Sequence, residues 1–248
     1  MNILVTGSAG YIGSHTAKAF LKAGHTPIVY NNLSRGHADA VLNGTLVQGD
    51  LSDTVKLLAT LTDRRIDAIL HFAAFAYVGE SMSQPCMYFE NNTVNSYRQL
   101  EVATHDRVNK IVFSSACATY GDPVSPPINE QHPQIHVNPC GESKLMVEKL
   151  LRWYGECHGI DRVAALRHFN AAGCDPSTLL GERHDSETHL IPLVLRANLS
   201  SDARLPSSAS TTPRPMAQSS ATTPTSIAMK AAAPETPPNS SPTAVALS

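Results

Sequence analysis

The sequence predicts an α/β fold in which a doubly wound, mostly parallel sheet carries helices on both faces. Short apolar segments alternate with segments of helical periodicity from the N-terminus to about residue 170, and a glycine-rich turn follows the first of them. This alternation is typical of βαβ units, whose parallel strands are covered on both faces. A chain of 248 residues is long enough for one large domain of this kind.

Each element is expected where an apolar run or a helical period is bounded by turn residues. The first apolar run leads into the glycine-rich turn, and the helical pattern behind it ends at Gly24, a natural helix stop. We expect strands over residues 2–6, 26–30, 45–48, 68–72, 111–114 and 162–167. We expect helices over residues 11–23, 53–62, 88–105 and 139–158.

Composition excludes several classes of function. The formal net charge of −2 supplies no basic excess for a phosphate backbone, so we expect no nucleic-acid partner. The N-terminus lacks the basic flank and cleavage site of a signal peptide, and no run approaches the roughly 18 apolar residues of a membrane span. The cysteines are odd in number, scattered and without C-x-x-C spacing, which indicates reduced thiols in the cytoplasm: Cys86, Cys117, Cys140, Cys157 and Cys174.

A phosphate-binding turn is predicted directly after the first strand. The segment T-G-S-A-G-Y-I-G-S-H at 6–15 places glycine at Gly7, Gly10 and Gly13. Such glycines allow a tight bend and a close approach of backbone N–H groups to a pyrophosphate, which then faces the positive end of the helix dipole. The G-x-x-G-x-x-G spacing differs from the commoner G-x-G-x-x-G, and an ordinary βα turn is the alternative. Its position at the start of a βαβα chain favours a Rossmann-like dinucleotide site.

The second strand of such a site normally ends in a carboxylate that binds the adenosine ribose hydroxyls. Here Asn31 and Asn32 follow Tyr30, and an amide is a weaker acceptor than a carboxylate. Arg35 lies nearby and is compatible with a 2′-phosphate, so the residues alone leave both NAD and NADP open. Asp50, after the third strand, is expected near the adenine edge, with a loop or N-cap role as the alternative.

Seven sequence blocks, taken in order, resemble the extended short-chain dehydrogenase/reductase family, and within it the UDP-glucose 4-epimerases. The blocks are T-G-S-A-G-Y-I-G-S-H at 6–15, N-N-L-S-R-G-H at 31–37, H-F-A-A-F-A-Y-V-G-E-S at 71–81, F-S-S-A-C-A-T-Y-G at 113–121, N-P-C-G-E-S-K-L-M-V-E at 138–148, R-H-F-N-A-A-G at 167–173 and E-T-H-L-I-P at 187–192. The resemblance covers about residues 1–200. It implies NAD as cofactor, a UDP-sugar as substrate, and a homodimer formed through helices over 84–107 and 140–158.

The resemblance also implies interconversion of UDP-glucose and UDP-galactose through a 4-keto sugar. In the family, a phenolate held by a Y-x-x-x-K pair removes the proton of the sugar 4-hydroxyl while NAD⁺ accepts the hydride, which returns to the other face. The i,i+4 spacing stacks the lysine beside the tyrosine, and the ammonium lowers the pKa of the phenol. A serine or threonine hydroxyl at the end of the preceding strand completes the relay.

This chain departs from the family pattern at the catalytic positions. Lys144 is present, but Cys140 stands where the family has tyrosine, and Ala116 stands where it has a hydroxyl. A thiol beside Lys144 can ionise, yet it reaches less far than a phenol, and proton transfer needs hydrogen-bond contact. We expect Ser115 or water to replace the missing hydroxyl poorly, Lys144 to contact the nicotinamide ribose, and epimerisation by this chain to be impaired.

The resemblance implies further binding residues. Those expected at the cofactor are Tyr11, Ile12, Asn31, Asn32, Asp50, Leu51, Phe72, Ala73, Ala74 and Asn91; those expected at the substrate are Ser115, Asn170, His189 and Leu190. An N-terminal helix cap is the alternative for Asn91 and Asn92. His168 replaces a family tyrosine, and a packed strand-end histidine is its equal alternative. His184 and His189 lack a cysteine partner, so we expect solvated loop residues and no metal site.

The composition changes near residue 200. Residues 201–248 contain ten Ser, ten Ala, eight Pro and seven Thr and no aromatic residue, so they cannot build a core. We expect a dinucleotide-binding domain over 1–200 with the substrate lobe largely missing, and a disordered tail over 201–248. One interpretation is a natural tail; the other is a shift of reading frame near residue 200, because a one-base shift can encode text that resembles the family's continuation.

Two alternatives to an epimerase remain. Another sugar-nucleotide enzyme, such as a 4,6-dehydratase or a decarboxylase, is disfavoured because the dehydratases carry an acidic pair after the strand that ends near Ser114, where this chain has Ala116 and Cys117. The non-enzymatic alternative is an NAD-binding pseudoenzyme or a broken gene product, which the residues at 116 and 140 favour.

Overall fold

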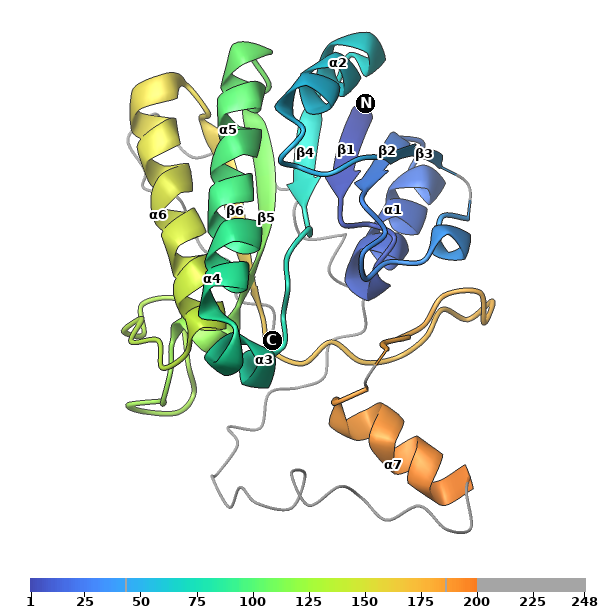
Figure 1. Cartoon of the computed structure of the whole chain (residues 1–248), viewed down its shortest axis with the longest axis vertical. Coiled ribbons are helices and arrows are strands. Elements are labelled where there is room, and N and C mark those ends of the chain that lie inside the picture. The colour runs from blue at the N-terminus through green and yellow to red at the C-terminus, as the bar shows by residue number, and fades with distance from the viewer. Residues whose placement is uncertain (43, 186, 200–248) are drawn as a thin grey trace.

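The computed structural model describes residues 1–42, 44–185 and 187–199 of the chain (Figure 1). Six strands form one parallel sheet in the order β3-β2-β1-β4-β5-β6. They are β1 (Asn2–Thr6), β2 (Thr26–Asn31), β3 (Thr45–Gln48), β4 (Ala68–His71), β5 (Lys110–Ala116) and β6 (Arg162–His168). The predicted doubly wound, Rossmann-like fold is confirmed.

Helices connect these strands and cover the two faces of the sheet unequally. They are α1 (Tyr11–Lys22), α2 (Thr54–Arg64), α3 (Val78–Ser83), α4 (Pro85–Tyr88), α5 (Asn95–His105), α6 (Pro139–His158) and α7 (Leu190–Leu199). Single turns lie at η1 (Ala38–Ala40), η2 (Phe89–Val94) and η3 (Cys117–Thr119), of which η2 is π-helical. Figure 1 shows α5 and α6 side by side over the sheet.

The main core lies between the sheet and the layer of α2, α5 and α6. Leu57, Leu100 and Leu151, one from each helix, pack there against alternate strand residues such as Leu4 and Ile111. The intervening strand residues face the other side, where Phe20 of α1 joins a smaller cluster made of Ile3, Val5 and Leu70. The alternation of buried residues along β1 therefore places α1 on the face opposite α2, α5 and α6.

Four helices differ from the expected pattern. The helix expected over 88–105 lies in a continuous path that starts at Pro85, runs through the π-turn η2 and ends with α5. Proline is favoured in the first helical turn, which explains the earlier start. Neither α3 nor α7 was expected, because the six residues of α3 are too few to show a period and most residues of α7 are apolar.

The switch point of the sheet lies between β1 and β4. β1 pairs with β2 on one side and with β4 on the other, so the connections after β1 and β4 lead away in opposite directions. Ligands of open parallel sheets bind at the carboxyl ends of the strands at such a switch point. The segment between β6 and α7 passes this edge and returns toward α1 (Figure 1). In the part of the chain that the structure describes, no helix combines the length and apolarity needed to cross a membrane.

Candidate functional site

The glycine turn lies at the switch point, between the ends of β1 and β4. Gly7 has φ +74°, and a Cβ there would lie 2.5 Å from the backbone nitrogen of Ala73. A Cβ at Gly13 would lie 2.6 Å from the Cα of Ser8. Both positions therefore exclude a side chain. Gly7 has a left-handed backbone conformation and lies against the backbone of Ala73, and Gly13 packs α1 closely against the turn at Ser8. The turn brings Gly7 next to Ala73, as expected of two segments that share one ligand.

The N-terminus of α1 opens from this turn toward solvent. Gly10 is the N-cap and supplies no side-chain cap, and the first helical turn has no acidic residue. The N–H groups of Tyr11 and Ile12 have no carbonyl partner within the helix, because none lies four residues earlier in helical geometry. These donors and the helix dipole suit an anionic group such as a pyrophosphate.

An open cleft lies beside this helix terminus. Its lining includes Gly10, Tyr11, Arg35, His37 and Glu182. The Tyr11 hydroxyl donates to the Gly173 carbonyl at 2.7 Å, and burial, followed by the charge of Glu182, raises the pKa of Tyr11 to about 12. Tyr11 is therefore a neutral phenol that joins α1 to the chain after β6.

The ends of β2 and β3 bring the expected adenosine-binding residues together. Asn32 donates through Nδ2 to Oδ2 of Asp50 at 2.6 Å, and Oδ1 of Asp50 accepts from the N–H and hydroxyl of Ser52. Burial favours a raised pKa for Asp50, but the hydrogen bonds from Ser52 and Asn32 outweigh it and hold the pKa below its usual value. Leu51 is buried beside it. Asn31 accepts from the N–H of Leu33 at 2.6 Å and shapes the turn.

Arg35 is held by a carboxylate and an aromatic ring. Its Nη2 lies 2.7 Å from Oε1 of Glu80, and its guanidinium lies 4.1 Å from the centre of the Phe75 ring. The hydrogen bond to Glu80 is the main reason that the pKa of Arg35 is raised. The charge that was expected to be available for a 2′-phosphate is thus already paired within the chain.

The segment after β4 is fixed by an amide that sequence reasoning did not select. Asn92 is buried in η2; its Oδ1 accepts from the N–H of Phe75 at 2.8 Å, and its Nδ2 donates to the Phe75 carbonyl and to Oγ of Ser143, each at 3.0 Å. Asn92 therefore ties the segment that contains Phe72, Ala73 and Ala74 to α6. The N-cap interpretation of Asn91 and Asn92 is wrong, because both lie inside the helical path.

The adjacent Asn91 and Asn92 could have been recognised as unusual from the sequence. Asparagine is a poor helix former in a helix interior, so two in a row inside a helical pattern indicate that a side chain binds something else. The structure assigns that role to Asn92, while the half-buried Asn91 donates to Oδ1 of Asn92 at 2.9 Å.

α6 carries Lys144, the lysine predicted at the catalytic position, and Cys140 four residues before it. Asn138 caps the helix by accepting from the N–H of Gly141 at 2.8 Å. Lys144 is fully buried, and its Nζ donates to the Ser114 carbonyl at 2.6 Å. Burial lowers the pKa of Lys144 from 10.5 to about 8, although the nearby Cys140 and Glu148 favour its charged form.

Cys140 is a neutral thiol. Its Sγ lies 3.9 Å from the Phe75 carbonyl, and burial raises the pKa of the thiol even though Lys144 acts in the opposite direction. Lys144 therefore does not favour the thiolate enough to offset burial, because the cost of burying the anion exceeds the attraction of the ammonium.

Ser115 is bound to a carboxylate. Its hydroxyl donates to Oε1 of Glu148, and the Arg167 guanidinium binds the same carboxylate at 3.0 and 2.7 Å. Burial favours a raised pKa for Glu148, but the hydrogen bonds from Arg167 and Ser115 outweigh it and hold the pKa low. The proton of the Ser115 hydroxyl is consequently directed at Glu148.

The ends of β5 and β6 place His168 beside Ala116. The two residues are register partners, and Nε2 of His168 is buried without a hydrogen-bond partner among the described residues. Burial, followed by repulsion from Lys144, lowers the pKa of His168 to about 4, so the imidazole is neutral. Asn170 follows the strand and is exposed.

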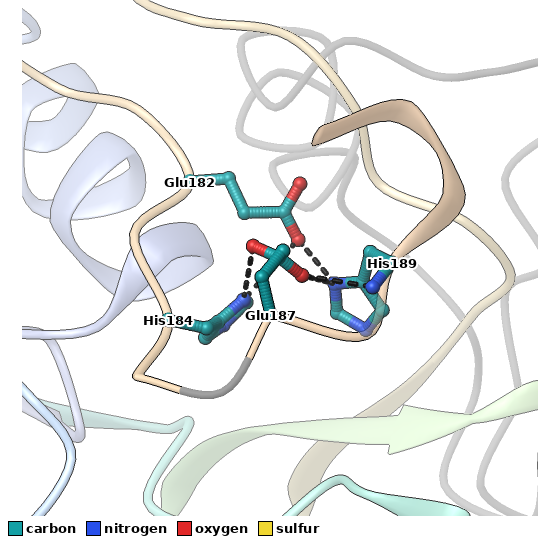
Figure 2. Close-up of side chains that lie close together, drawn as sticks. All are labelled: Glu182, His184, Glu187 and His189. Atoms are coloured by element: carbon teal, nitrogen blue, oxygen red, sulfur yellow. Dashed lines mark hydrogen bonds and ion pairs between the residues drawn. The ribbon is translucent and has the colours of Figure 1, made fainter. Parts of the chain in front are cut away.

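His189 and Leu190 lie where α7 begins, on the segment that returns toward α1. His184 is half-buried and His189 is exposed, and both lie outside the helices and strands. Their Nδ1 atoms converge with the carboxylates of Glu182 and Glu187 (Figure 2). The sequence reasoning considered only cysteine as a partner of these histidines and did not select the two glutamates. Leu190 is exposed.

Comparison with known proteins agrees with this geometry. The model of the NAD dependent epimerase/dehydratase family matches residues 3–214. The UDP-glucose 4-epimerase of Halalkalibacterium halodurans is 48% identical over 83% of this chain and 61% of its own length; that of Lacticaseibacillus casei is 46% identical over 79% and 59%. The chain thus spans about 60% of the length of the curated relatives it matches.

Solved structures lead to the same family. UDP-glucose 4-epimerase from Brucella ovis in complex with NAD matches with a TM-score of 0.77 and 45% identity, over 79% of this chain and 62% of that one. The enzyme from Bifidobacterium longum in complex with NAD⁺ and UDP matches with a TM-score of 0.70 and 33% identity, over 75% and 58%. The chain therefore belongs to the NAD dependent epimerase/dehydratase family.

Proposed function

We propose that this chain binds NAD across the carboxyl ends of β1 and β4, with the pyrophosphate at the N-terminus of α1. The observation that carries the proposal is the glycine turn: it leaves no room for a Cβ at Gly7, and the helix end that it presents to the cleft has neither a side-chain cap nor an acidic residue in its first turn. Asn32 and Asp50, joined at the ends of β2 and β3, are the proposed adenosine contacts.

The pairing of Arg35 supports NAD over NADP. A 2′-phosphate needs a guanidinium with unpaired donors, whereas Arg35 binds Glu80 at 2.7 Å and lies on the Phe75 ring. Turning Arg35 to a phosphate breaks that ion pair and leaves Glu80 near the anion. Phe72, Ala73, Ala74 and Asn91 are the proposed contacts on the nicotinamide side of the switch point.

We propose the epimerisation of a UDP-sugar as the activity of the whole protein, by way of a 4-keto sugar. Bound NAD supplies a reversible hydride acceptor for that chemistry. Lys144 donates to the Ser114 carbonyl and is the proposed contact of the nicotinamide ribose. Ser115, Asn170, His189 and Leu190 are the proposed substrate contacts.

Proton transfer is the step for which this chain is poorly equipped. The buried Cys140 thiol is neutral, Ala116 has no hydroxyl, and the Ser115 hydroxyl donates to Glu148. None of these groups offers a base at the distance of a phenol oxygen. The second candidate function, an NAD-binding pseudoenzyme, rests on this observation, so we expect binding of NAD with epimerisation close to background.

Binding is tested by titrating the full chain with NADH and following its fluorescence. Gly7→Ala should weaken binding at least about tenfold, because its Cβ meets the backbone of Ala73. Gly24→Ala is the matched control: Gly24 also has positive φ, +81°, but a Cβ there meets nothing within 4 Å. Equal loss of NADH binding in both variants, or no binding by the parent chain, overturns the site.

Activity is tested by measuring UDP-galactose formation from UDP-glucose in the same preparation. NADH binding together with turnover near background supports the impaired enzyme. Turnover at a rate ordinary for enzymes, about 1 per second or more, contradicts the proposal that the missing phenol impairs proton transfer.

We also propose a homodimer formed by α5 and α6, and a cytoplasmic location. Tyr97, Met146 and Trp153 expose apolar surface on these two helices, which supports an interface there. All five cysteines of the chain are free thiols, which supports a reducing compartment.

A further inference from the structure

Four side chains between β6 and α7 converge on one point at the wall of the cleft. Figure 2 shows Glu182, His184, Glu187 and His189 directed toward one another, with one ligand atom from each within 4.8 Å of the others. Nδ1 of His184 lies 3.4 Å from Oε1 of Glu182 and 3.4 Å from Oε2 of Glu187. Nδ1 of His189 lies 3.8 Å from Oε1 of Glu187 and also contacts Oε1 of Glu182.

Further contacts orient three of the four side chains, Glu187, His184 and His189. The side chain of Glu187 is 1% exposed, and its Oε1 accepts from the backbone N–H groups of Thr188 and His189 at 2.9 and 2.8 Å. Tyr77 packs the edges of both imidazole rings, with ring centres 5.7 and 6.4 Å away. Such outer contacts orient metal ligands in proteins.

One of the four proposed ligand atoms, Nδ1 of His184, lacks a hydrogen bond within the described part of the chain. Nδ1 of His184 is buried and has no hydrogen-bond partner among the described residues, although two carboxylates lie 3.4 Å away. A buried polar atom without a partner is costly and calls for an explanation. A cation placed between this nitrogen and the two carboxylates would satisfy all three groups.

We propose that Glu182, His184, Glu187 and His189 bind one divalent first-row transition ion, of which Zn²⁺ is the type. Bonds of about 2.0–2.1 Å to Zn²⁺ in tetrahedral geometry place the ligand atoms about 3.3 Å apart, close to the 3.4 Å that separates Nδ1 of His184 from Oε1 of Glu182 and from Oε2 of Glu187. Oε1 of Glu182 and Nδ1 of His189 are in hydrogen-bond contact and would move apart to bind the same ion. Imidazole nitrogen favours Zn²⁺ over Mg²⁺ or Ca²⁺, which prefer six or more oxygen ligands.

Charge supports the same assignment. With neutral imidazoles the cluster carries two carboxylate charges, and one divalent ion neutralises them. Two imidazolium ions also neutralise the cluster, so protons are the competitor that the experiment must separate from a metal.

The ion would join side chains within one short stretch, from Glu182 to His189. Glu182 and His184 line the cleft at α1, and His189 precedes α7 by one residue. The ion would therefore order part of the wall of the cleft and the approach to α7. The titration below uses no NAD, so it tests the ion separately from the dinucleotide site.

The experiment is a titration of the metal-stripped full chain with Zn²⁺ by calorimetry and with Co²⁺ by visible absorption. We expect one ion per chain, proton release on binding, and the intense visible bands of tetrahedral Co²⁺. His184→Asn and Glu187→Gln should each weaken Zn²⁺ binding at least about tenfold. The thermal midpoint of the parent chain should rise with Zn²⁺, and that of His184→Asn should stay unchanged.

His136→Gln is the matched control, because His136 also pairs with a glutamate, Glu142, but forms no cluster of three or more ligands in the described chain. Its Zn²⁺ affinity should equal that of the parent. His184 is partly exposed, so His184→Asn is expected to fold, and its circular dichroism verifies this. Absence of Zn²⁺ binding by the parent, or equal binding by the parent and a folded His184→Asn, overturns the proposal and assigns the cluster to proton-mediated pairs alone.

Discussion

Lys144 combines complete burial with an amine that must find its hydrogen bonds inside the protein. Its Nζ donates to the Ser114 carbonyl at 2.6 Å and lies 4.9 Å from the centre of the Phe113 ring, but no carboxylate contacts it in the described structure. A carbonyl and a ring face compensate only part of the lost hydration, so burial dominates and the pKa falls to about 8. The ammonium is therefore maintained at a cost in stability.

Lys144→Met tests this cost through its pH dependence. Between pH 8 and 10.5 the unfolded chain binds a proton at Lys144 that the folded chain has released, so raising the pH through this window removes the penalty. Relative to Lys144→Met, the parent should gain about 3 kcal/mol of unfolding free energy from pH 7 to pH 10.5. Urea unfolding of both proteins across this range measures the difference; a constant difference contradicts the lowered pKa.

The sequence predicted which residues share the catalytic helix face but not their ionisation. The spacing of Cys140 and Lys144 fixes their adjacency, since residues four apart lie on one helix face. Whether the thiol ionises depends on how much of it is buried, and that follows from the packing of α6 against β5 and η2, which are distant in sequence. For the same reason the hydrogen bond from Ser115 to Glu148 was not predictable.

At the scale of the element, α5 and α6 present an apolar surface on the side away from the sheet. Trp153 is 54% exposed and Tyr97 44% exposed, although the opposite faces of both helices are buried in the main core. A helix with apolar residues on two sides is typical of one that packs against the core and against a second surface.

Trp153→Glu should weaken the proposed homodimer, since a large aromatic side chain at the centre of an interface often contributes 2 kcal/mol or more. The dissociation constant should rise at least roughly tenfold, measured by analytical ultracentrifugation over a range of concentrations. Val55→Glu, at an exposed apolar residue of α2, provides the control and should leave the association unchanged. A parent chain that sediments as a monomer at all concentrations refutes the interface.

Element prediction succeeded where one period or one boundary residue dominates. β1, β3 and α6 have the expected bounds, because apolar runs and the Asn138–Pro139 start mark them locally. The path from α4 to α5 was less well predicted, because the π-turn η2 is stabilised by long-range bonds from Asn92 to Phe75 and Ser143. α7 carries no such local mark.

For the whole molecule, the parallel order of the strands brings the proposed cofactor contacts to one side of the sheet, at the carboxyl ends of its strands. The switch point between β1 and β4 follows from a chain that builds three strands outward and then returns, which the alternating pattern made predictable. The segment between β6 and α7 was not predictable, because its position depends on contacts with α1, among them Lys18 to Asp175 at 2.6 Å and Tyr11 to Gly173. The four proposed metal ligands belong to this segment. The tail over 201–248 lies outside the described residues.

α7 leaves the largest run of apolar side chains without cover in the described structure. Leu195 is 57% exposed and Leu199 88% exposed, and no residue of the helix is buried. Exposed apolar patches of this kind bind hydrophobic dyes and promote association. The double variant Leu195→Gln/Leu199→Gln should therefore lower the fluorescence of the dye anilinonaphthalene sulfonate by about half, since it removes two of the largest contributors to the patch. Val124→Gln, at a residue 70% exposed but outside α7, should change the signal little. If the dye signal of the double variant equals that of the parent, then α7 is covered in solution and its apolar face already has a partner within the chain or in a second copy.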